Sequence, residues 1–303
     1  MSPDPVYTLA DLESWSRPAP SLAVLGHPID HSLSPPMHNA ALAAEASSGR
    51  HPADWRYFRF DIPPSDLPRA LTQLQARRFR GVNLTVPHKV MAFDLVKEID
   101  FQARICGAVN TLLLTPVGWH GYNTDGYGLA AAVGENFGRE LAGATILLLG
   151  AGGAARGAAV ECLSRRCASL WIANRTREHL DRLLVFLRPM AGGIPMRALD
   201  DSAAPPEGAI VVNATSAGLR PGEPSPIDLS LLPQPAAVMD MIYNPARTAL
   251  LAQAERLGVP AANGMSMLAH QGAKSLEIWT GIPAERSAPV MLAAGRAALE
   301  QPT

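Results

Sequence analysis

Cysteine is scarce in this sequence of 303 residues, and its scarcity excludes two kinds of protein. The chain has 3 cysteines, Cys106, Cys162 and Cys167, and no C-x-x-C motif. A disulfide framework and a zinc site are therefore not indicated, and no other spacing typical of metal ligands is present. We expect three free thiols that pack as small hydrophobic side chains, and no metal.

An excess of charge of one sign is also lacking, as are long hydrophobic runs. Lys and Arg number 26 against 27 Asp and Glu, so no large field attracts a polyanion and no nucleic-acid partner is expected. No apolar run approaches the roughly 18–20 residues of a membrane span. The opening MSPDPVYTLADLE has no basic region typical of a signal peptide. We therefore expect a cytoplasmic protein with no membrane partner.

The composition itself is that of a globular protein, with 48% hydrophobic and 17% charged residues. At roughly 100–200 residues per domain, the length predicts about two domains or one large one. Residues 1–20 contain four prolines after the opening Met-Ser, and we interpret them as an N-terminal tail. Regular structure is expected to begin at residue 21.

Apolar runs and helical stretches alternate over residues 21–124 and predict an α/β unit with a mainly parallel sheet. The expected strands are SLAVLG (21–26), DWRYFRFDI (54–62), GVNLTV (81–86) and AVNTLLL (108–114). Ser34 is expected to cap a helix with Pro35 at its first position, and Ser65 to cap a second helix over 65–78. Pro87 is expected to open a third helix, whose apolar spacing continues to Ile99.

The pattern restarts after Asp125 and predicts a second α/β unit. The expected strands are ATILLLG (144–150), ASLWIAN (168–174), AIVVNAT (209–215) and AVMDMIY (237–243). A helix over 247–258 is expected to stop at Gly258, and further helices are expected near 265–280 and 288–300.

A glycine cluster directly follows the first strand of the second unit. It comprises Gly150, Ala151, Gly152, Gly153, Ala154 and Ala155. Gly150, Gly152 and Ala155 fit G-x-G-x-x-G/A, in which the residues allow a tight turn, close approach of a pyrophosphate and close packing of helix on sheet. An ordinary turn in a chain rich in Ala and Gly is the alternative. The strand before the cluster and the helix after it favour a Rossmann-like dinucleotide site.

The next strand of this unit ends in Asn174-Arg175-Thr176-Arg177. An enzyme that uses NAD commonly carries Asp or Glu there, as an acceptor for the ribose 2′-hydroxyl. Arginines instead favour the 2′-phosphate of NADP through charge-assisted hydrogen bonds. The sequence therefore predicts NADP as the cofactor.

Polar segments follow the strands of the first unit, where open α/β sheets bind ligands. They are HSLSP (31–35), NLTVPHK (83–89), AVNT (108–111) and NTDG (123–126). Their hydroxyls, amides, ammonium and carboxylate suit a small polyhydroxylated substrate, although helix capping explains Ser34, Asn110 or Asp125 individually just as well. Lys89 is expected at about N3 of the helix opened by Pro87, beside the positive end of the helix dipole. That position is unfavourable for a cation but suited to a lysine that transfers a proton.

Taken together, these motifs resemble the shikimate dehydrogenase family. The segments that carry the resemblance are HSLSP, GVNLTVPHK, AVNT, NTDG, GAGGAA, NRT, DMIYNP and NGMSMLAHQGA, in this order from about residue 21 to 280. The resemblance implies a substrate-binding domain over 21–124, completed by C-terminal helices within 265–303. It also implies a Rossmann-like NADP-binding domain over 125–264.

The resemblance also implies the roles of individual residues. Ser32 and Ser34 would hold a substrate carboxylate, and Lys89 and Asp125 would be the catalytic pair. Substrate oxygens would contact Thr85, Asn110, Tyr243 and Gln271. The adenosine phosphate would bind Asn174, Arg175, Thr176 and Arg177, and the nicotinamide side would be lined by Met241 and Gly264. The family commonly has Asn-Arg-Thr-x-x-Arg, whereas this chain has His179 at the last position and Arg177 two residues earlier.

The activity so implied is the reversible NADP-dependent reduction of 3-dehydroshikimate to shikimate, within aromatic amino-acid biosynthesis. One alternative is a quinate or aminoshikimate dehydrogenase of the same fold, with either NAD or NADP as its cofactor. Another is a nucleotide-sensing or scaffold protein without activity, which predicts loss of the proton-transfer pair, yet Lys89 and Asp125 are both present. A monomer or a homodimer is expected.

Overall fold

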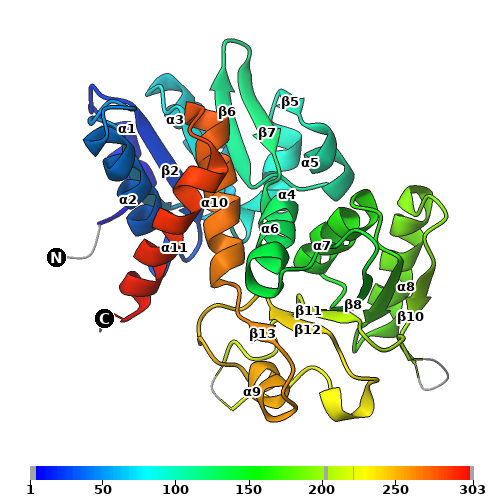
Figure 1. Ribbon diagram of the computed structural model, residues 1–303. Helices are drawn as coiled ribbons and strands as arrows, with labels where there is room; N and C mark the ends of the chain where they lie inside the picture. Colours follow the sequence, from blue (N-terminus) through cyan, green and yellow to red (C-terminus); the bar gives the residue numbers. More distant parts are fainter. Residues whose placement is uncertain (1–4, 201–203, 221, 301–303) are drawn as a thin grey trace. The chain divides into compact units, whose positions relative to one another are not determined.

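The computed structural model describes residues 5–200, 204–220 and 222–300, and the chain divides into two compact units (Figure 1). The first comprises residues 1–124 and 269–303, and the second comprises residues 125–268. Each unit contains its own open β-sheet with helices packed against it. Within the described ranges, no helix is long and apolar enough to cross a membrane.

The first unit has a sheet of seven strands in the order β1-β3-β2-β4-β6-β7-β5. Its strands are β1 (Val6–Tyr7), β2 (Ser21–Gly26), β3 (Arg56–Asp61), β4 (Gly81–Leu84), β5 (Glu98–Ile99), β6 (Thr111–Thr115) and β7 (Gly118–Tyr122). Strand β2 is parallel to both β3 and β4, whereas β6 is antiparallel to β4 and β7. The sheet is thus mainly parallel, as predicted, with a hairpin of β6 and β7 that the sequence analysis did not anticipate.

The helices of this unit come from both ends of the chain. They are α1 (Leu9–Glu13), α2 (Ser34–Ser47), η1 (Pro64–Asp66), α3 (Leu67–Ala76), α4 (His88–Met91), η2 (Ala92–Leu95), α5 (Phe101–Cys106), α10 (Met265–Thr280) and α11 (Ala284–Glu300), where η marks a 3₁₀ helix. Helix α10 belongs to this unit from Ala269 onward.

The interpretation as a tail is wrong for residues 5–20, whereas residues 1–4 lie outside the described part of the chain. Strand β1 pairs with β3, and α1 begins at a capping box formed by Thr8 and Asp11. Trp15 packs edge-on against Phe58 at a ring distance of 4.8 Å, and Tyr7 packs against the same ring. The aromatic contacts hold this segment on the sheet despite its prolines.

Three expected helix boundaries also differ. Ser34 is the first residue of α2 and not its cap, because Leu33 occupies the capping position. Ser65 lies inside η1, and α3 starts after Asp66. The helix after Pro87 ends at Leu95, because the chain then extends to pair β5 with β7, and Ile99 lies opposite Gly121.

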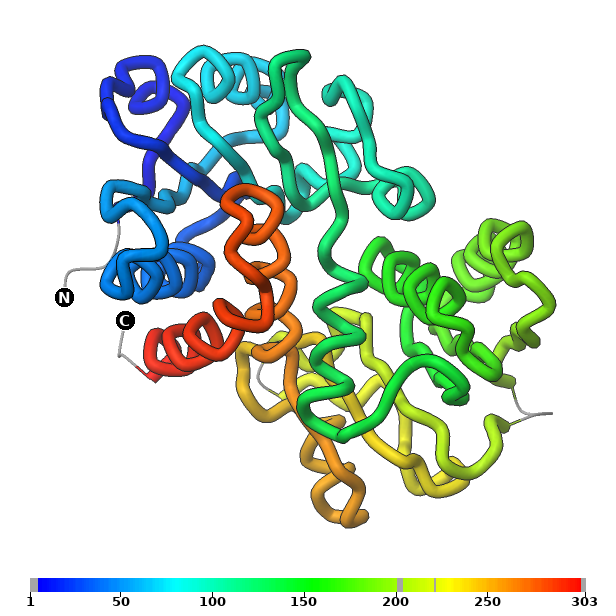
Figure 2. Tube along the Cα trace, turned by 45° about the horizontal axis from the view of Figure 1, so that its top comes forward, coloured from blue at the N-terminus to red at the C-terminus, as the bar shows by residue number. Residues whose placement is uncertain are grey.

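The C-terminal helices pack against the first unit through specific contacts. Trp279 of α10 is buried over Gly81 of β4, where a built Cβ would lie only 2.2 Å from the indole. The indole Nε1 donates a hydrogen bond of 2.9 Å to the carbonyl oxygen of Leu112. Helix α11 runs beside α2 (Figure 2), and Arg286 pairs with the buried Glu45 at 2.9 Å. The close approach of the Trp279 indole to β4 therefore requires glycine at position 81.

The second unit has six parallel strands in the order β10-β9-β8-β11-β12-β13. They are β8 (Thr145–Leu149), β9 (Ser169–Ala173), β10 (Met196–Ala198), β11 (Ile210–Asn213), β12 (Ala237–Asp240) and β13 (Ala261–Ala262). Numbered within the unit, this order is 3-2-1-4-5-6, the order of the Rossmann fold. The four strands expected from the sequence are confirmed.

The helical segments of the second unit are α6 (Asp125–Phe137), α7 (Gly153–Ser164), α8 (Arg177–Leu187), η3 (Arg188–Met190), η4 (Leu229–Leu231) and α9 (Ala249–Arg256). Gly258, with φ +66°, follows the Leu257 cap of α9 and stops the helix as expected. Cys106, Cys162 and Cys167 are all buried free thiols, as predicted.

Candidate active site

The turn that carries the two serines lies between β2 and α2 in the first unit. The main-chain N–H of Ser32 donates to the carbonyl oxygen of Ile29 at 3.0 Å, and that of Ser34 donates to Oγ of Ser32 at 3.3 Å. Because Leu33 is the cap and makes no side-chain capping bond, the Ser34 hydroxyl is not used to start the helix. It lies beside the Tyr57 hydroxyl and lowers the pKa of that group. The turn therefore presents two half-buried hydroxyls at the beginning of a helix.

A buried polar network continues from Tyr57 into the sheet. The Tyr57 hydroxyl donates to Oδ1 of Asn83 at 2.8 Å, and Nδ2 of Asn83 donates to Oγ of Ser275 at 3.0 Å. Ser275 lies on α10 and contacts Thr111 at 2.7 Å. Burial raises the pKa of Tyr57 well above 10.0, while the neighbouring Ser34 side chain lowers it, so the hydroxyl keeps its proton near neutral pH.

Asn110 joins the same network to Gln271. Its Nδ2 donates to Oε1 of Gln271 at 3.2 Å and to Oγ1 of Thr124 at 3.0 Å. Its Oδ1 accepts from Thr111 Oγ1 at 2.9 Å and from the main-chain N–H of Thr124, also at 2.9 Å. The structure thus brings Asn110 and Gln271 together, although the sequence places them on a strand and a distant helix. It adds Tyr57 and Ser275 to the candidate site, and it brings in Asn83 and Thr124 from the polar segments marked in the sequence.

Thr85 and Lys89 lie just past β4. The N–H of Thr85 donates to the carbonyl oxygen of Leu25 at 2.9 Å, which fixes Thr85 beside the end of β2. The carbonyl oxygen of Lys89 accepts from the N–H of Val109 at 2.9 Å, so the Lys89 main chain lies next to the segment that carries Asn110. Helix α4 has only 4 residues and Lys89 is its second. The expected N3 position in a long helix is wrong, and a single turn supplies little dipole.

His88, the neighbour of Lys89, is fully buried. Its Nε2 contacts the carbonyl oxygen of Ile62 at 2.9 Å, and its pKa is lowered, chiefly by burial. His88 is therefore neutral at pH 7 and holds the turn onto the sheet. Lys89, by contrast, is half-buried and in contact with solvent.

The glycine turn of the second unit has the geometry that a dinucleotide site requires. Gly150 adopts φ +115°, which other residues rarely adopt, and its N–H donates to the Ala173 carbonyl oxygen at 2.7 Å. Gly152 caps α7, and a Cβ built at Gly152 or Gly153 meets no atom within 4 Å. Ala155, in the first turn of α7, is fully buried. The N-terminus of α7 thus faces open space, which fits a pyrophosphate.

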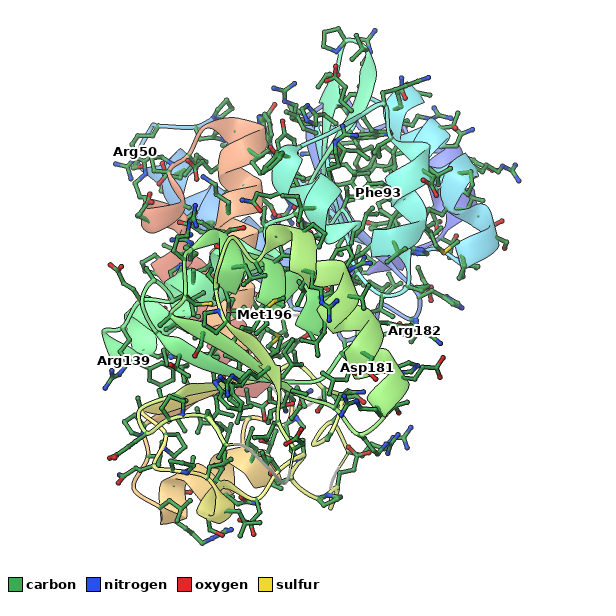
Figure 3. The ribbon with its side chains drawn as sticks, turned by 90° about the vertical axis from the view of Figure 1, so that its right-hand side faces the viewer. Arg50, Phe93, Arg139, Asp181, Arg182 and Met196 are labelled. Carbon is green, nitrogen blue, oxygen red and sulfur yellow. The ribbon has the colours of Figure 1, made fainter. Side chains whose placement is uncertain are left out.

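The segment after β9 is exposed and leads into α8. Asn174 Nδ2 donates to the Thr176 carbonyl oxygen at 2.8 Å, which shapes the turn. Arg177 is already paired with Asp181 at 2.9 Å along the helix, and Figure 3 labels Asp181 on α8. Arg175 precedes the helix and is exposed. The charge of Arg177 is shared with Asp181, so Arg175 is the better placed of the two to bind an added phosphate.

Met241 and Gly264 are brought together in the second unit. A Cβ built at Gly264 would lie 2.1 Å from the Met241 carbonyl oxygen, so only glycine fits there. Tyr243 follows two residues after Met241, and burial raises the pKa of its hydroxyl. The N–H of Met241 donates to the Asn213 carbonyl oxygen at 3.0 Å, which fixes this segment at the end of β11.

Behind this segment lies a buried polar pair that was not predicted from the sequence, Asn213 and Asp240. Each is the last residue of an apolar strand, and the two are partners in the parallel register. The rule that marked the polar residues after strands in the first unit would have marked these two as well.

The two proposed catalytic residues belong to different units. Lys89 lies in the first unit, and Asp125 is the first residue of α6 and of the second unit. Their pairing stays a prediction. Among the described residues there is no group of three or more His, Cys, Asp or Glu that could hold a metal ion.

Comparison with known proteins assigns the family. Residues 24–112 match the shikimate dehydrogenase substrate binding domain, 132–219 match shikimate / quinate 5-dehydrogenase, and 264–294 match the shikimate 5'-dehydrogenase C-terminal domain. The chain is 42% identical to the shikimate dehydrogenase (NADP(+)) of Methylobacterium radiotolerans, over 89% of this chain and 94% of that protein. It is 40% identical to the enzyme of the same name from Symbiobacterium thermophilum, over 95% and 97%.

Solved structures agree with the sequence relatives. The shikimate 5-dehydrogenase of Thermus thermophilus, in complex with NADP(H) and shikimate, superposes with a TM-score of 0.78 at 35% identity. The match covers 92% of this chain and 99% of that chain. Matching domains, high identity over nearly the whole length and a common fold lead to one conclusion: the chain belongs to the shikimate dehydrogenase family.

Proposed function

We propose that this protein catalyses the reversible NADP-dependent reduction of 3-dehydroshikimate to shikimate, a step of aromatic amino-acid biosynthesis. The observation that carries the proposal is the connected edge of the first unit, where Asn110 and Gln271 bond to each other and the Lys89 main chain is tied to Val109. Donors and acceptors fixed in this way suit a ring with several hydroxyls. The segments 21–124 with 265–303 would bind the substrate, and 125–264 the cofactor.

The substrate would be held by neutral groups whose positions are fixed in advance. Ser32 and Ser34 would donate to its carboxylate at the start of α2, where an anion is favoured. Thr85, Asn110, Gln271 and Tyr243 would bind its oxygens. Because Asn110 is held by Thr111 and Thr124, it need not reorganise when the substrate binds, which favours catalysis.

The cofactor would be held by residues that fit its phosphates. The turn of Gly150, Ala151, Gly152, Gly153, Ala154 and Ala155 supports this proposal by the open space around Gly152 and Gly153 and by the positive φ of Gly150. Arg175, with Asn174 and Thr176, would bind the 2′-phosphate, and Met241 and Gly264 would line the nicotinamide. When bound, NADP(H) supplies the hydride chemistry, and the protein handles the proton.

Lys89 and Asp125 would act on the substrate hydroxyl. Lys89 would exchange its proton with the oxygen, and Asp125 would accept a hydrogen bond that orients the hydroxyl. The burial of His88 supports this assignment, because it removes the neighbouring rival base. No metal is required in this scheme.

A spectrophotometric assay at about 340 nm tests the proposal, with shikimate and quinate each combined with NADP⁺ and NAD⁺. The proposal expects the highest kcat/KM for shikimate with NADP⁺. A higher kcat/KM for quinate, or for NAD⁺, would replace it with the paralogue activity. The cytoplasmic location and the monomer or homodimer stay predictions.

A further inference from the structure

Strand β3 carries an arginine, Arg59, that is buried beside the serine turn. The side chains of β3 alternate, so that Phe58 and Phe60 pack in the aromatic cluster while Tyr57 and Arg59 lie on the other face. Arg59 is only 8% exposed. Burial of a guanidinium is costly unless it is hydrogen-bonded, so its position needs an explanation.

The partners of Arg59 include main-chain carbonyls of the turn between β2 and α2. Its Nη1 donates to the carbonyl oxygens of Asp30 and, at 3.5 Å, Ser32. Ser32 in turn accepts from the N–H of Ser34 through its Oγ, at 3.3 Å. Arg59 therefore holds from behind the turn that presents both hydroxyls.

Tyr57, two residues away on the same face, packs against the start of α2. Its ring stacks on His38 of α2 at 4.1 Å with an angle of 3°, and its hydroxyl lies beside Ser34, which lowers its pKa. One face of β3 thus supports the whole serine turn. Ser32, Ser34 and Tyr57 are neutral, and Arg59 is the buried cation beside them. Of the two nearby carboxylates, Asp30 in the turn is exposed, and Asp61 at the end of β3 pairs with His27 at 2.5 Å.

We propose that Arg59 is a specificity-determining residue, which makes the serine turn select a carboxylated substrate over an uncharged one. The inference rests on the proposed function for the identity of the substrate. Arg59 acts through the turn and through its charge, and it is a positioning residue without contact to the reacting atoms. In the protein interior a charge acts over several ångströms with little screening, so one buried cation is expected to change anion affinity by about ten-fold.

Two variants separate charge from hydrogen bonding. Arg59→Gln keeps an N–H donor for the carbonyls but loses the charge, whereas Arg59→Lys keeps the charge but loses the planar fork. Arg56→Gln is the matched control, because Arg56 is an exposed arginine at the beginning of the same strand. Thermal unfolding of each variant shows whether the fold is retained.

The ligands are shikimate and its uncharged methyl ester. Calorimetric titration measures their Kd, and the oxidation assay with NADP⁺ measures kcat and KM. We expect Arg59→Gln to weaken shikimate binding by about ten-fold, with the ester and kcat changed by less than about two-fold. Arg59→Lys should keep most of the preference for shikimate, and Arg56→Gln should keep all of it.

Equal losses for shikimate and the ester in Arg59→Gln would overturn the inference, because they would show that Arg59 only shapes the turn. The inference would also be overturned if Arg59→Lys lost the preference for shikimate over the ester as fully as Arg59→Gln does. If the wild type binds shikimate more tightly than the ester but does not oxidise it, the proposed function fails, and the calorimetric comparison still decides the role of Arg59.

Discussion

Asn213 donates a hydrogen bond of 2.9 Å to Oδ1 of Asp240, and neither residue has exposed surface. The two are register partners at the ends of β11 and β12. Thr248 donates to Oδ2 of Asp240 at 2.6 Å, and the N–H of Ile242 donates to Oδ1 at 3.1 Å. Three donors therefore fix the carboxyl group directly before Met241, and with it the segment proposed to face the nicotinamide.

Two replacements of Asp240 are expected to distinguish the contribution of its hydrogen bonds to stability from that of its charge. Asp240→Ala should lower the free energy of unfolding by about 2–4 kcal/mol, because it leaves buried donors of Asn213 and Thr248 without an acceptor. Asp240→Asn keeps the shape and Oδ1 and should cost less than about 1 kcal/mol. Urea unfolding at pH 7.5 measures both, and equal costs for Ala and Asn would contradict this account.

The pH dependence of the free energy of unfolding, compared between Asp240→Asn and the wild type, gives a second test. Burial raises the pKa of Asp240 from its ordinary 3.8, against the lowering effect of its three hydrogen bonds. A carboxyl whose pKa is raised by folding stabilises the protein most at low pH, and that contribution is lost as the pH rises through the folded pKa. Above pH 3.8, the stability of Asp240→Asn relative to wild type should therefore rise with pH.

Helix packing in the first unit provides a contrasting carboxylate, Glu45. It accepts from Arg50, labelled in Figure 3, at 3.0 Å and from Arg286 of α11 at 2.9 Å. Its pKa is lowered, chiefly by the hydrogen bond from Arg50, so its contribution to stability is present above pH 4.5 and lost as the pH falls through the folded pKa. Glu45→Gln should cost about 1–3 kcal/mol at pH 7 and progressively less below pH 4.5.

The control for Glu45 is Glu178→Gln on α8. The Glu178 side chain is 71% exposed and pairs with Arg182, which Figure 3 labels on the same helix. Exposed pairs of this kind contribute about 0–1 kcal/mol, so the control should unfold almost as the wild type does. Equal destabilisation by the two variants, measured by urea unfolding, would refute a special role for the pairing of α2 with α11.

The sequence predicts the second unit well because its signals are local and agree. Residues 144–155 combine an apolar run, a glycine that needs a positive φ and small residues at the start of a helix, and the structure forms each of these features. Val96 and Ile99 show where local signals fail. Both side chains pack on the same core in an extended segment that bends at Lys97, and pairing with β7 favours this form over a helix.

Long-range packing accounts for the site residues that sequence analysis missed. In the sequence, Ser275 has the features of an ordinary helix residue. It joins the site only because α10 packs on the sheet, through a contact between Trp279 and Leu112, which are 167 residues apart in the chain. Tyr57 likewise has the features of an ordinary strand residue in the sequence, and it joins the site because α2 places Ser34 beside it. No periodicity of one segment contains such information.

The preference for NADP is expected to depend on Arg175. Arg175→Asp should lose most of it, because the change removes a charge-assisted contact of about 1.5–3 kcal/mol and adds a repulsive carboxylate. Arg177→Gln should have a smaller effect, since Asp181 already shares that charge. Arg182→Asp is the control for a charge change on the same helix. The ratio of kcat/KM for NADP⁺ and NAD⁺ is the measurement, and equal values in the wild type would contradict the prediction.

The serine turn is expected to affect binding rather than stability. Ser34→Ala should raise the KM for shikimate, and the double variant with Ser32→Ala should raise it further. Because Leu33 and not Ser34 occupies the capping position of α2, the usual loss of about 1 kcal/mol for a removed cap is not expected. An unchanged KM in a folded double variant would refute the assignment, and thermal unfolding checks the fold.

Lys89 is expected to transfer the proton, with Asp125 as its partner. Positioned proton transfer contributes about 10²–10⁴-fold, so Lys89→Ala should lower kcat by about that factor. Binding of NADP⁺ should stay nearly intact, and the KM for shikimate should change much less than kcat. If Lys89 and Asp125 act as one unit, the double alanine variant should be little slower than the slower single variant.

His88→Ala distinguishes this assignment from its closest rival. The ring is fully buried against the Ile62 carbonyl oxygen, so its removal should lower thermal stability while the folded fraction keeps most of its kcat. Activity is therefore compared per folded molecule, at a temperature well below the unfolding transition of each variant. Near-normal kcat in Lys89→Ala together with complete loss in folded His88→Ala would make His88 the base, and the argument from its burial would then be wrong.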